Sequence, residues 1–278
     1  MVSVSPWPLT ISFFICFLLI CTVNGFHYEY NLLGLTVDPL FLIFFALVFV
    51  LIVMFDWFKD IISESVFGGF YTLFVQKNLT SGMVLFLASE AMFFFSFFWS
   101  FFHYSLNPSI HTGSVWPVFG IIPVNPFHLP LLNTITLLLS GVYATASHFH
   151  LSSGIGNAID FKTNFFAGNN FLIGLKESLI VSIVLGTIFI FTQGYEFSVA
   201  DFNLTDSVYG SVFHILTGFH GLHVIIGVIF LGVSLFRCFK NQFFYETHLG
   251  FKFSVWYWHF VDVIWILVYL FVYIWGSF

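Results

Sequence analysis

The sequence predicts an all-α, polytopic membrane protein with seven transmembrane helices. Hydrophobic residues make up 59% of the 278 positions and charged residues only 7%, against about 25% charged in ordinary globular proteins. With seven basic and 13 acidic side chains, a soluble protein of this size could not cover its surface, so the remaining apolar surface must face lipid. Seven apolar stretches are long enough to span, because about 20 helical residues cross the hydrocarbon core.

The predicted spans are separated by segments with turn and cap residues. Asp38-Pro39 precedes the second span, Asn107-Pro108 follows the third, and the Pro-rich loop 116–130 precedes the fourth. This loop is expected on the outer surface, against a partner protein or the membrane interface. No internal repeat and no stretch polar enough for a soluble domain is visible. We predict one membrane domain over residues 1–278, with spans at 9–26, 40–58, 82–102, 129–147, 175–194, 209–236 and 253–273.

The basic residues give the predicted helices a direction. They all lie in or beside the second, fourth and sixth connections, which share one face of a seven-helix protein. These residues are Lys59, Lys77, Lys162, Lys176, Arg237, Lys240 and Lys252. By the positive-inside rule this face is cytoplasmic, or the matrix in a mitochondrion, and the N-terminus shares it.

Several familiar classes of site are not expected. Cys16, Cys21 and Cys238 lie in or beside apolar runs, with no zinc, haem-attachment or thioredoxin spacing. The first ten residues contain no basic residue and no clear cleavage site, so we expect the first apolar run to stay in the mature protein. The net charge of −6 includes no run of one sign, which predicts no nucleic-acid partner.

Glu90 is an acid in the middle of the third predicted span. A charged carboxylate at that depth costs roughly 2.5–3.5 kcal/mol on insertion scales, so it needs a partner or a proton. One interpretation is a proton-linked or gating carboxylate. The other is a buried hydrogen bond that holds helices together, and the sequence does not separate the two.

Two further pairs of polar residues have helical spacing. His220 and His223 are three residues apart, as are His259 and Asp262, so each pair shares a helix face. Their helices are joined by a short connection, which predicts antiparallel neighbours and an imidazole–carboxylate cluster inside the bundle. Such a set could bind zinc or iron. Because no thiolate or dense carboxylate set supports a metal, we favour a polar cluster at helix contacts.

Motifs in order along the chain carry a family resemblance. They are SPWPLT at 5–10, Ser89-Glu90 with FFW at 97–99, WP at 116–117, TGFHGLHV at 217–224 and YWHFVDV at 257–263. With these motifs the chain resembles subunit III of the mitochondrial-type cytochrome c oxidase, a haem–copper terminal oxidase. The resemblance runs nearly from end to end.

The resemblance implies a fold and a role. Subunits of this family arrange their helices in two groups, the first two and the last five, around a cleft that holds phospholipids. They carry no haem or copper, which reside in subunits I and II. The chain is thus expected to be a non-redox core subunit of complex IV, in contact with subunits I and II and smaller accessory subunits. Its role would be to support proton uptake, lipid binding and stability while the complex transfers electrons from cytochrome c to O2.

Individual residues take roles from the same resemblance. Glu90 corresponds to the intramembrane acid of the family, and the histidines become structural or lipid-proximal. Glu64 and Arg237 correspond to polar positions near lipid headgroups, and Trp99 to an aromatic at the edge of the cleft. Lys59 also belongs to this lipid set, at a position where the family often has Arg, so it keeps the charge but loses the bidentate fork.

Alternatives remain at this stage. A stand-alone transporter could use Glu90 and Asp262 as a proton relay, although such proteins usually show internal repeats and broken helices. A quinol oxidase subunit would share the fold and differ only in the electron donor of its partner. The expected location is the mitochondrial inner membrane, with the N-terminus in the matrix and the C-terminus in the intermembrane space. A bacterial plasma membrane is the alternative.

Overall fold

The computed structural model describes residues 4–27, 30–32, 35–110, 113–153, 174–243 and 247–277. Its internal contacts divide the chain into two compact units, Met1–Leu79 and Thr80–Phe278. Seven of the described helices are long and apolar enough to cross a membrane by length and composition. The predicted number of spans is therefore confirmed.

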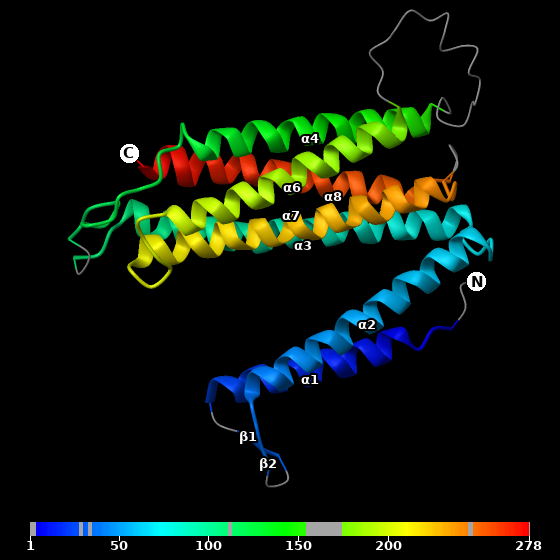
Figure 1. Cartoon of the computed structure of the whole chain (residues 1–278), viewed down its shortest axis with the longest axis horizontal. Coiled ribbons are helices and arrows are strands. Elements are labelled where there is room, and N and C mark those ends of the chain that lie inside the picture. Colours follow the sequence, from blue (N-terminus) through cyan, green and yellow to red (C-terminus); the bar gives the residue numbers. More distant parts are fainter. Residues whose placement is uncertain are drawn as a thin grey trace, which may run out of the picture. The chain divides into compact units, whose positions relative to one another are not determined.

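The first unit holds two helices joined by a short hairpin. Its elements are α1 (Trp7–His27), β1 (Tyr30–Leu32), β2 (Leu35–Val37) and α2 (Pro39–Val66). The two helices lie side by side (Figure 1), and the ring of Phe14 stacks on Phe49 with 5.3 Å between centroids. The Asp38 side chain accepts a hydrogen bond from the backbone N–H of Leu40 at 2.9 Å, which caps α2 with Pro39 in its first turn.

The hairpin is an addition to the all-α prediction. β1 and β2 pair antiparallel, with Tyr30 opposite Val37. Each strand has three residues, which is too short to show the two-residue alternation that marks a strand in a sequence.

The second unit is a bundle of helices that run side by side (Figure 1). Its elements are α3 (Leu73–Leu106, which begins in the first unit), α4 (Leu129–Ser152), α6 (Leu175–Val199), α7 (Val208–Phe239), α8 (Leu249–Val268), the π-helix η2 (Tyr269–Ile274) and the short η3 (Trp275–Ser277). Half of an 18-residue window of the last span is buried, against 39% in α4, 33% in α7, 28% in α6 and 11% in α3. The helix α8 and its π-helical continuation therefore form the centre of this bundle.

Two tryptophans of α8 build the core, and both are fully buried. Trp258 donates its indole N–H to Ser140 Oγ at 2.9 Å, and Trp265 donates to Thr134 Oγ1 at 3.0 Å. Both hydroxyls belong to α4, so each polar tip has a partner inside the apolar interior, as a buried Trp requires. Gly186 of α6 and Gly227 of α7 leave space for the Trp258 ring, because a Cβ at either position would collide with it.

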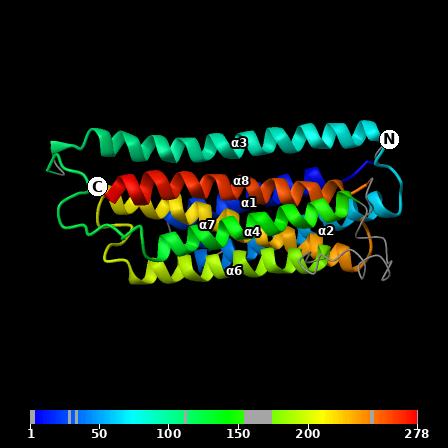
Figure 2. The same cartoon turned by 90° about the horizontal axis from the view of Figure 1, so that it is seen from above.

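The helix α3 joins the bundle through aromatic side chains. Figure 2 shows α3 along one edge of the second unit. Phe93 and Phe97 pack on Phe219 of α7, with 5.2 and 5.3 Å between centroids. Phe102 packs on Phe271 of η2 at 5.2 Å. This pattern explains part of the very high Phe content, since large rings fill the space between α3 and its neighbours.

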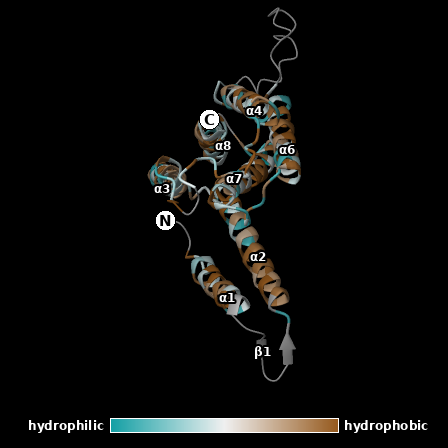
Figure 3. Ribbon diagram, turned by 90° about the vertical axis from the view of Figure 1, so that its left-hand side faces the viewer, coloured by the Kyte–Doolittle hydropathy of each residue, from teal (hydrophilic) through white to brown (hydrophobic). Residues whose placement is uncertain are grey.

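Most helices extend beyond the predicted spans. The second span was predicted to end at residue 58, yet α2 continues through charged residues to Val66, shortly before Gly68-Gly69. Hydropathy marks only the hydrocarbon-crossing part, whereas a helix continues until a glycine, proline or cap stops it. Figure 3 shows hydrophobic residues along the length of the helices. Many of their large apolar side chains are exposed, as expected of surfaces that contact lipid or a partner subunit.

The described basic residues of the second unit gather at one end of the bundle. Lys176, at the start of α6, lies 5.1 Å over the ring of Phe239 at the end of α7. Arg237 and Lys240 are at that same end of α7, and Lys252 is in the first turn of α8. Lys162 lies outside the described residues.

Candidate functional site

Glu90 lies near the middle of α3 and is the acid around which the site is built. The neighbouring Ser89 donates its hydroxyl to the carbonyl of Phe86 at 2.7 Å, so this hydroxyl is satisfied within its own helix. The Glu90 side chain is half-buried, with 23% exposed. Unlike the Ser89 hydroxyl, the Glu90 carboxyl makes its hydrogen bond to a residue of another helix.

The partner of Glu90 is His223 of α7. Glu90 Oε2 lies 2.8 Å from His223 Nε2. The His223 ring is itself enclosed by Phe94, edge-on at 4.9 Å, and by Tyr257, stacked at 6.4 Å. The site thus joins α3 to α7, with α8 closing one side.

The geometry determines how many protons this pair holds. His223 Nδ1 lies 2.7 Å from the carbonyl oxygen of Phe219, one turn earlier in α7. A carbonyl only accepts, so Nδ1 carries a hydrogen. The contact between Nε2 and Glu90 Oε2 then needs one proton, on the carboxyl or on the imidazole. In both forms the net charge of the pair is zero, which a membrane interior tolerates far better than a lone ion.

His220 has a different environment from His223. It is fully buried, and its Nε2 donates to the backbone carbonyl of Val261 on α8 at 3.2 Å. The rings of Trp265 and Phe189 pack around it at 5.0 and 5.6 Å. Its Nδ1 has no partner among the described residues. This geometry is that of a histidine tying α7 to α8.

His259 and Asp262 contact α4. The Thr145 hydroxyl lies 3.0 Å from the carbonyl of Gly141 and 3.0 Å from His259 Nε2. Its single hydrogen goes to the carbonyl, so its oxygen accepts from His259 N–H. His259 Nδ1 faces Asp262 Oδ2 at 3.6 Å, longer than a hydrogen bond. The Asp262 carboxyl lies against Gly141, where any Cβ would collide with it.

The four residues predicted as one polar cluster thus make three separate contacts. His223 pairs with Glu90, His220 with backbone, and His259 and Asp262 with α4. Residues three apart on a helix differ by about 60° in direction. This difference lets His220 and His223 reach different neighbouring helices.

Two of the residues predicted to bind lipid, Trp99 and Arg237, lie far apart within the second unit. Lys59 and Glu64 lie on α2 in the first unit, whereas Trp99 and Arg237 lie in the second. Arg237 is 18 residues beyond the α7 residue that contacts Phe97, hence about 27 Å along the axis, while Trp99 adjoins Phe97 on α3. Trp99 and Arg237 therefore lie toward opposite ends of the bundle.

Arg237 and Trp99 also differ in how firmly they are held. The guanidinium of Arg237 lies 4.2 Å over the Phe243 ring, and its Nε donates to Gln242 Oε1 at 3.2 Å. The indole of Trp99 is 67% exposed. Arg237 is thus pre-positioned at the basic end, whereas Trp99 presents its ring to the surroundings.

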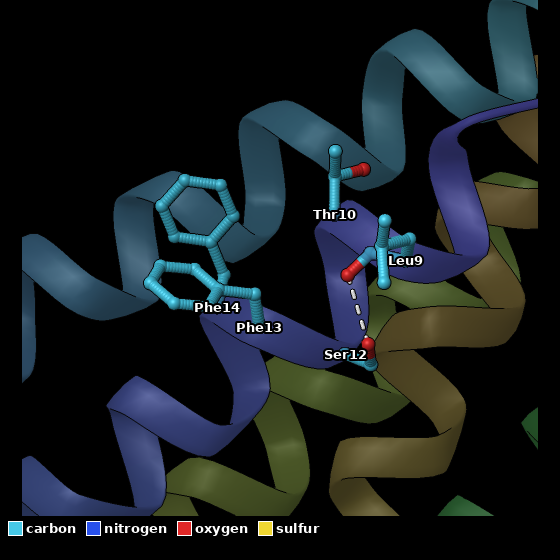
Figure 4. Close-up of a pocket in the computed structure, with 5 residues that line it drawn as sticks. All are labelled: Leu9, Thr10, Ser12, Phe13 and Phe14. Carbon is cyan, nitrogen blue, oxygen red and sulfur yellow. Dashed lines mark hydrogen bonds between the residues drawn. The ribbon is translucent and has the colours of Figure 1, made fainter.

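Two hollows lie in the first unit. One is lined by Leu9, Thr10, Ser12, Phe13 and Phe14 of α1 alone (Figure 4). It offers no ionisable group, and Ser12 donates its hydroxyl to the Leu9 carbonyl. The other is more polar and includes Glu64, together with Val4, Ser5, Pro6, Trp7, Trp57, Asp60, Ile61, Tyr71, Val75 and Leu79. Glu64, one of the residues predicted to bind lipid, lines this second hollow.

Sequence reasoning missed Glu196, the most deeply buried acid among the described residues. The predicted fifth span ended at residue 194, which left Glu196 in a loop. In the structure α6 continues to Val199, and Glu196 is 3% exposed. Gln193 and Glu196 share a helix face at a spacing of three residues, and this was the signal that could have extended the span.

No metal centre is formed by the part of the chain that the structure describes. No three of its His, Cys, Asp or Glu side chains come together in a group that could hold an ion. The acid and the imidazole of this site, 2.8 Å apart, can exchange a proton and form a hydrogen bond.

Known proteins that are similar to this chain match it over its full length and carry the same name. The family model for cytochrome c oxidase subunit III matches residues 1–277. A protein of Chondrus crispus named cytochrome c oxidase subunit 3 is 42% identical over 277 residues, covering 100% of this chain and 93% of the relative. Proteins of the same name from Neurospora crassa and Lumbricus terrestris are each 43% identical, covering 100% of this chain and 94% and 97% of theirs.

Proposed function

Because the chain belongs to the cytochrome c oxidase subunit III family, we propose that it acts as a non-redox core subunit of complex IV. In this role it binds subunits I and II, whose haem and copper centres transfer electrons from cytochrome c to O2. Its own contribution is to support proton uptake, to hold phospholipids and to stabilise the complex. Full-length similarity to proteins named as this subunit supports the proposal.

The Glu90–His223 pair is the observation that carries the proton-linked part. It places one exchangeable proton on the α3–α7 contact, between an acid and a base 2.8 Å apart. Glu90 is still 23% exposed on this chain, so a group of an adjacent subunit or of a lipid can contact its carboxyl. A purely structural hydrogen bond is the second candidate, favoured by the closed packing of Phe94 and Tyr257 around His223.

Two substitutions of Glu90 distinguish these roles in the purified complex. Glu90→Gln keeps a hydrogen bond, because the glutamine amide can donate to Nε2 of a neutral His223, but it removes the exchangeable proton. Glu90→Ala leaves the imidazole unpaired, which costs about 1–3 kcal/mol. If Glu90 is proton-linked, Glu90→Gln reduces proton uptake and shortens the working life of the enzyme during turnover, with normal thermal stability. If only Glu90→Ala has an effect, the structural role alone remains. Glu177→Gln, at an exposed acid of α6, is the control.

Lipid binding is proposed at two levels of the membrane. At the basic end, Arg237 presents a guanidinium that can pair bidentately with a phosphate. Lys59 and Glu64 of α2 provide a second polar group, and Trp99 an aromatic contact at the other end of the bundle. Phospholipid analysis of complexes carrying Arg237→Gln or Trp99→Leu would show loss of different lipids. Unchanged lipid content in both would contradict these assignments.

The proposed location is the mitochondrial inner membrane, as a multi-pass protein. The basic end of the bundle faces the matrix together with the N-terminus, and the C-terminus faces the intermembrane space. A bacterial plasma membrane is the second candidate. Cysteine-specific labelling from each side of sealed inner-membrane vesicles tests this orientation.

Co-purification tests membership of the complex. The chain should be isolated in mild detergent together with a haem-bearing subunit I and a copper-bearing subunit II. An isolated chain that carries out proton-coupled transport by itself would contradict the proposal and favour a transporter.

A further inference from the structure

A buried acid at the carboxyl end of α6 has no part in the function proposed above. Glu196 is 3% exposed. Its Oε1 accepts from the hydroxyl of Tyr273 at 2.5 Å and from Nε2 of Gln193 at 3.4 Å. Tyr273 belongs to η2, and π-helical segments are frequent at functional sites. The acid therefore ties the end of α6 to the π-helix.

The hydrogen bonds around Glu196 form a chain with one direction. The Thr192 hydroxyl donates to Asn133 Oδ1, and Asn133 Nδ2 donates to Gln193 Oε1 at 3.3 Å. Gln193 Nε2 then donates to the Tyr273 oxygen at 3.3 Å, and Tyr273 donates to Glu196. Every donor points toward the carboxyl, so Oε1 is well supplied with hydrogens.

The second oxygen of this carboxyl is in the opposite situation. Glu196 Oε2 is buried and has no hydrogen-bond partner among the described residues. The described residues also provide no ion pair to Glu196. Two titratable groups of α7 lie near this site: His214, which packs on Phe197, and Tyr209, whose neighbour Phe213 packs on Tyr273. His214 contacts Phe197 and bonds a backbone carbonyl of its own helix, so it is not a counter-ion.

A charged carboxylate would be unstable in this position. It would bury a net negative charge with no cation and with one oxygen without any donor, a combination that proteins avoid. A proton on Oε2 removes the charge, while Oε1 stays as a carbonyl oxygen that accepts from Tyr273. We propose that Glu196 is a second proton-holding site of this chain, a neutral carboxylic acid with its proton on Oε2.

This site is separate from the Glu90–His223 pair. Phe189 of α6 packs against His220, one turn from His223, and Glu196 is seven residues further along, roughly 10 Å along the axis. The two acids thus lie at different depths of the bundle. The proposal does not depend on the role of Glu90 in proton uptake.

Infrared spectroscopy of the purified complex tests the proposal directly. The C=O stretch of a carboxylic acid is well separated from the bands of a carboxylate. The spectrum of the unmodified complex minus that of Glu196→Gln should show one carboxylic-acid band, which shifts to lower frequency in D2O. Glu177→Gln, at the exposed acid of the same helix, should remove carboxylate intensity only. Loss of carboxylate intensity in Glu196→Gln would mean that Glu196 is ionised, and would overturn the proposal.

A second variant keeps the test valid if Glu196→Gln fails to assemble. Tyr273→Phe retains the acid and removes the hydroxyl that donates to Oε1. The carboxylic-acid band should then move to higher frequency, because its C=O loses a hydrogen bond. An acid band unchanged by Tyr273→Phe would contradict the assignment, since Glu196 would not be the source of that band.

Discussion

Replacing Gly227 with alanine tests the packing around Trp258, the central side chain of the bundle. A Cβ at Gly227 would lie 2.7 Å from Cε3 and 2.9 Å from Cζ3 of the Trp258 ring. The Trp258 ring has no room to move away from Gly227. Gly186 lies so close to another edge of the ring that a Cβ there would also collide with it, and the indole N–H is hydrogen-bonded to Ser140. Overpacking of this kind costs about 1–3 kcal/mol.

The matched control is Gly232→Ala in the same helix. At Gly232 a Cβ meets no heavy atom of the described residues within 4 Å. Both substitutions gain the same helix propensity, about 1 kcal/mol relative to glycine. The difference between the two variants therefore isolates the steric cost of the contact with Trp258.

The assay is the thermal stability of the purified complex, together with the amount of this chain retained in it. Gly227→Ala should lower the melting temperature and the retained amount relative to Gly232→Ala. If both variants melt at the same temperature and retain the chain equally, the packing of Trp258 against α7 is not as the structure shows.

Two further predictions concern single hydrogen bonds. Trp258→Phe should destabilise the complex by about 1–3 kcal/mol, because the buried Ser140 hydroxyl no longer accepts a hydrogen bond from the indole N–H and a cavity forms. The double variant Trp258→Phe with Ser140→Ala should recover part of that loss of stability. No recovery would contradict the contact between Trp258 and Ser140. Trp7→Phe removes the exposed hydrogen bond from the Trp7 indole N–H to Asp60 Oδ2, which is 2.8 Å long. The free energy of unfolding, followed by thermal melting, should fall by no more than about 1 kcal/mol. A larger loss would show that Trp7 has a role beyond this bond.

Much of the fold could be predicted because it depends on local properties. Long apolar stretches and their separating turn residues predicted seven helices, and all seven are present. The ends were less accurate, as in α2, which continues to Val66 through charged residues because no glycine or proline interrupts it earlier. The hairpin of β1 and β2 was missed, since three-residue strands leave no recognisable pattern.

The candidate site was predictable only in part. Glu90 stood out because an acid in the middle of a span is costly, but its partner was not foreseen. His223 was assigned to a cluster with His259 and Asp262, whereas the structure pairs it with Glu90. Glu196 was placed in a loop, and only the extended α6 showed that it is buried.

The sequence by itself determined that this chain is a seven-helix membrane protein, which residues are costly in lipid, and which family its motifs resemble. These conclusions follow from composition, hydropathy and short motifs, which need no knowledge of distant contacts. Only the tertiary structure decided which carboxyl meets which imidazole and which buried carboxyl oxygens have no hydrogen-bond donor among the described residues. Those choices depend on how the helices are rotated against one another, and that rotation is set by contacts between residues far apart in the chain, such as Trp258 with Gly186 and Gly227.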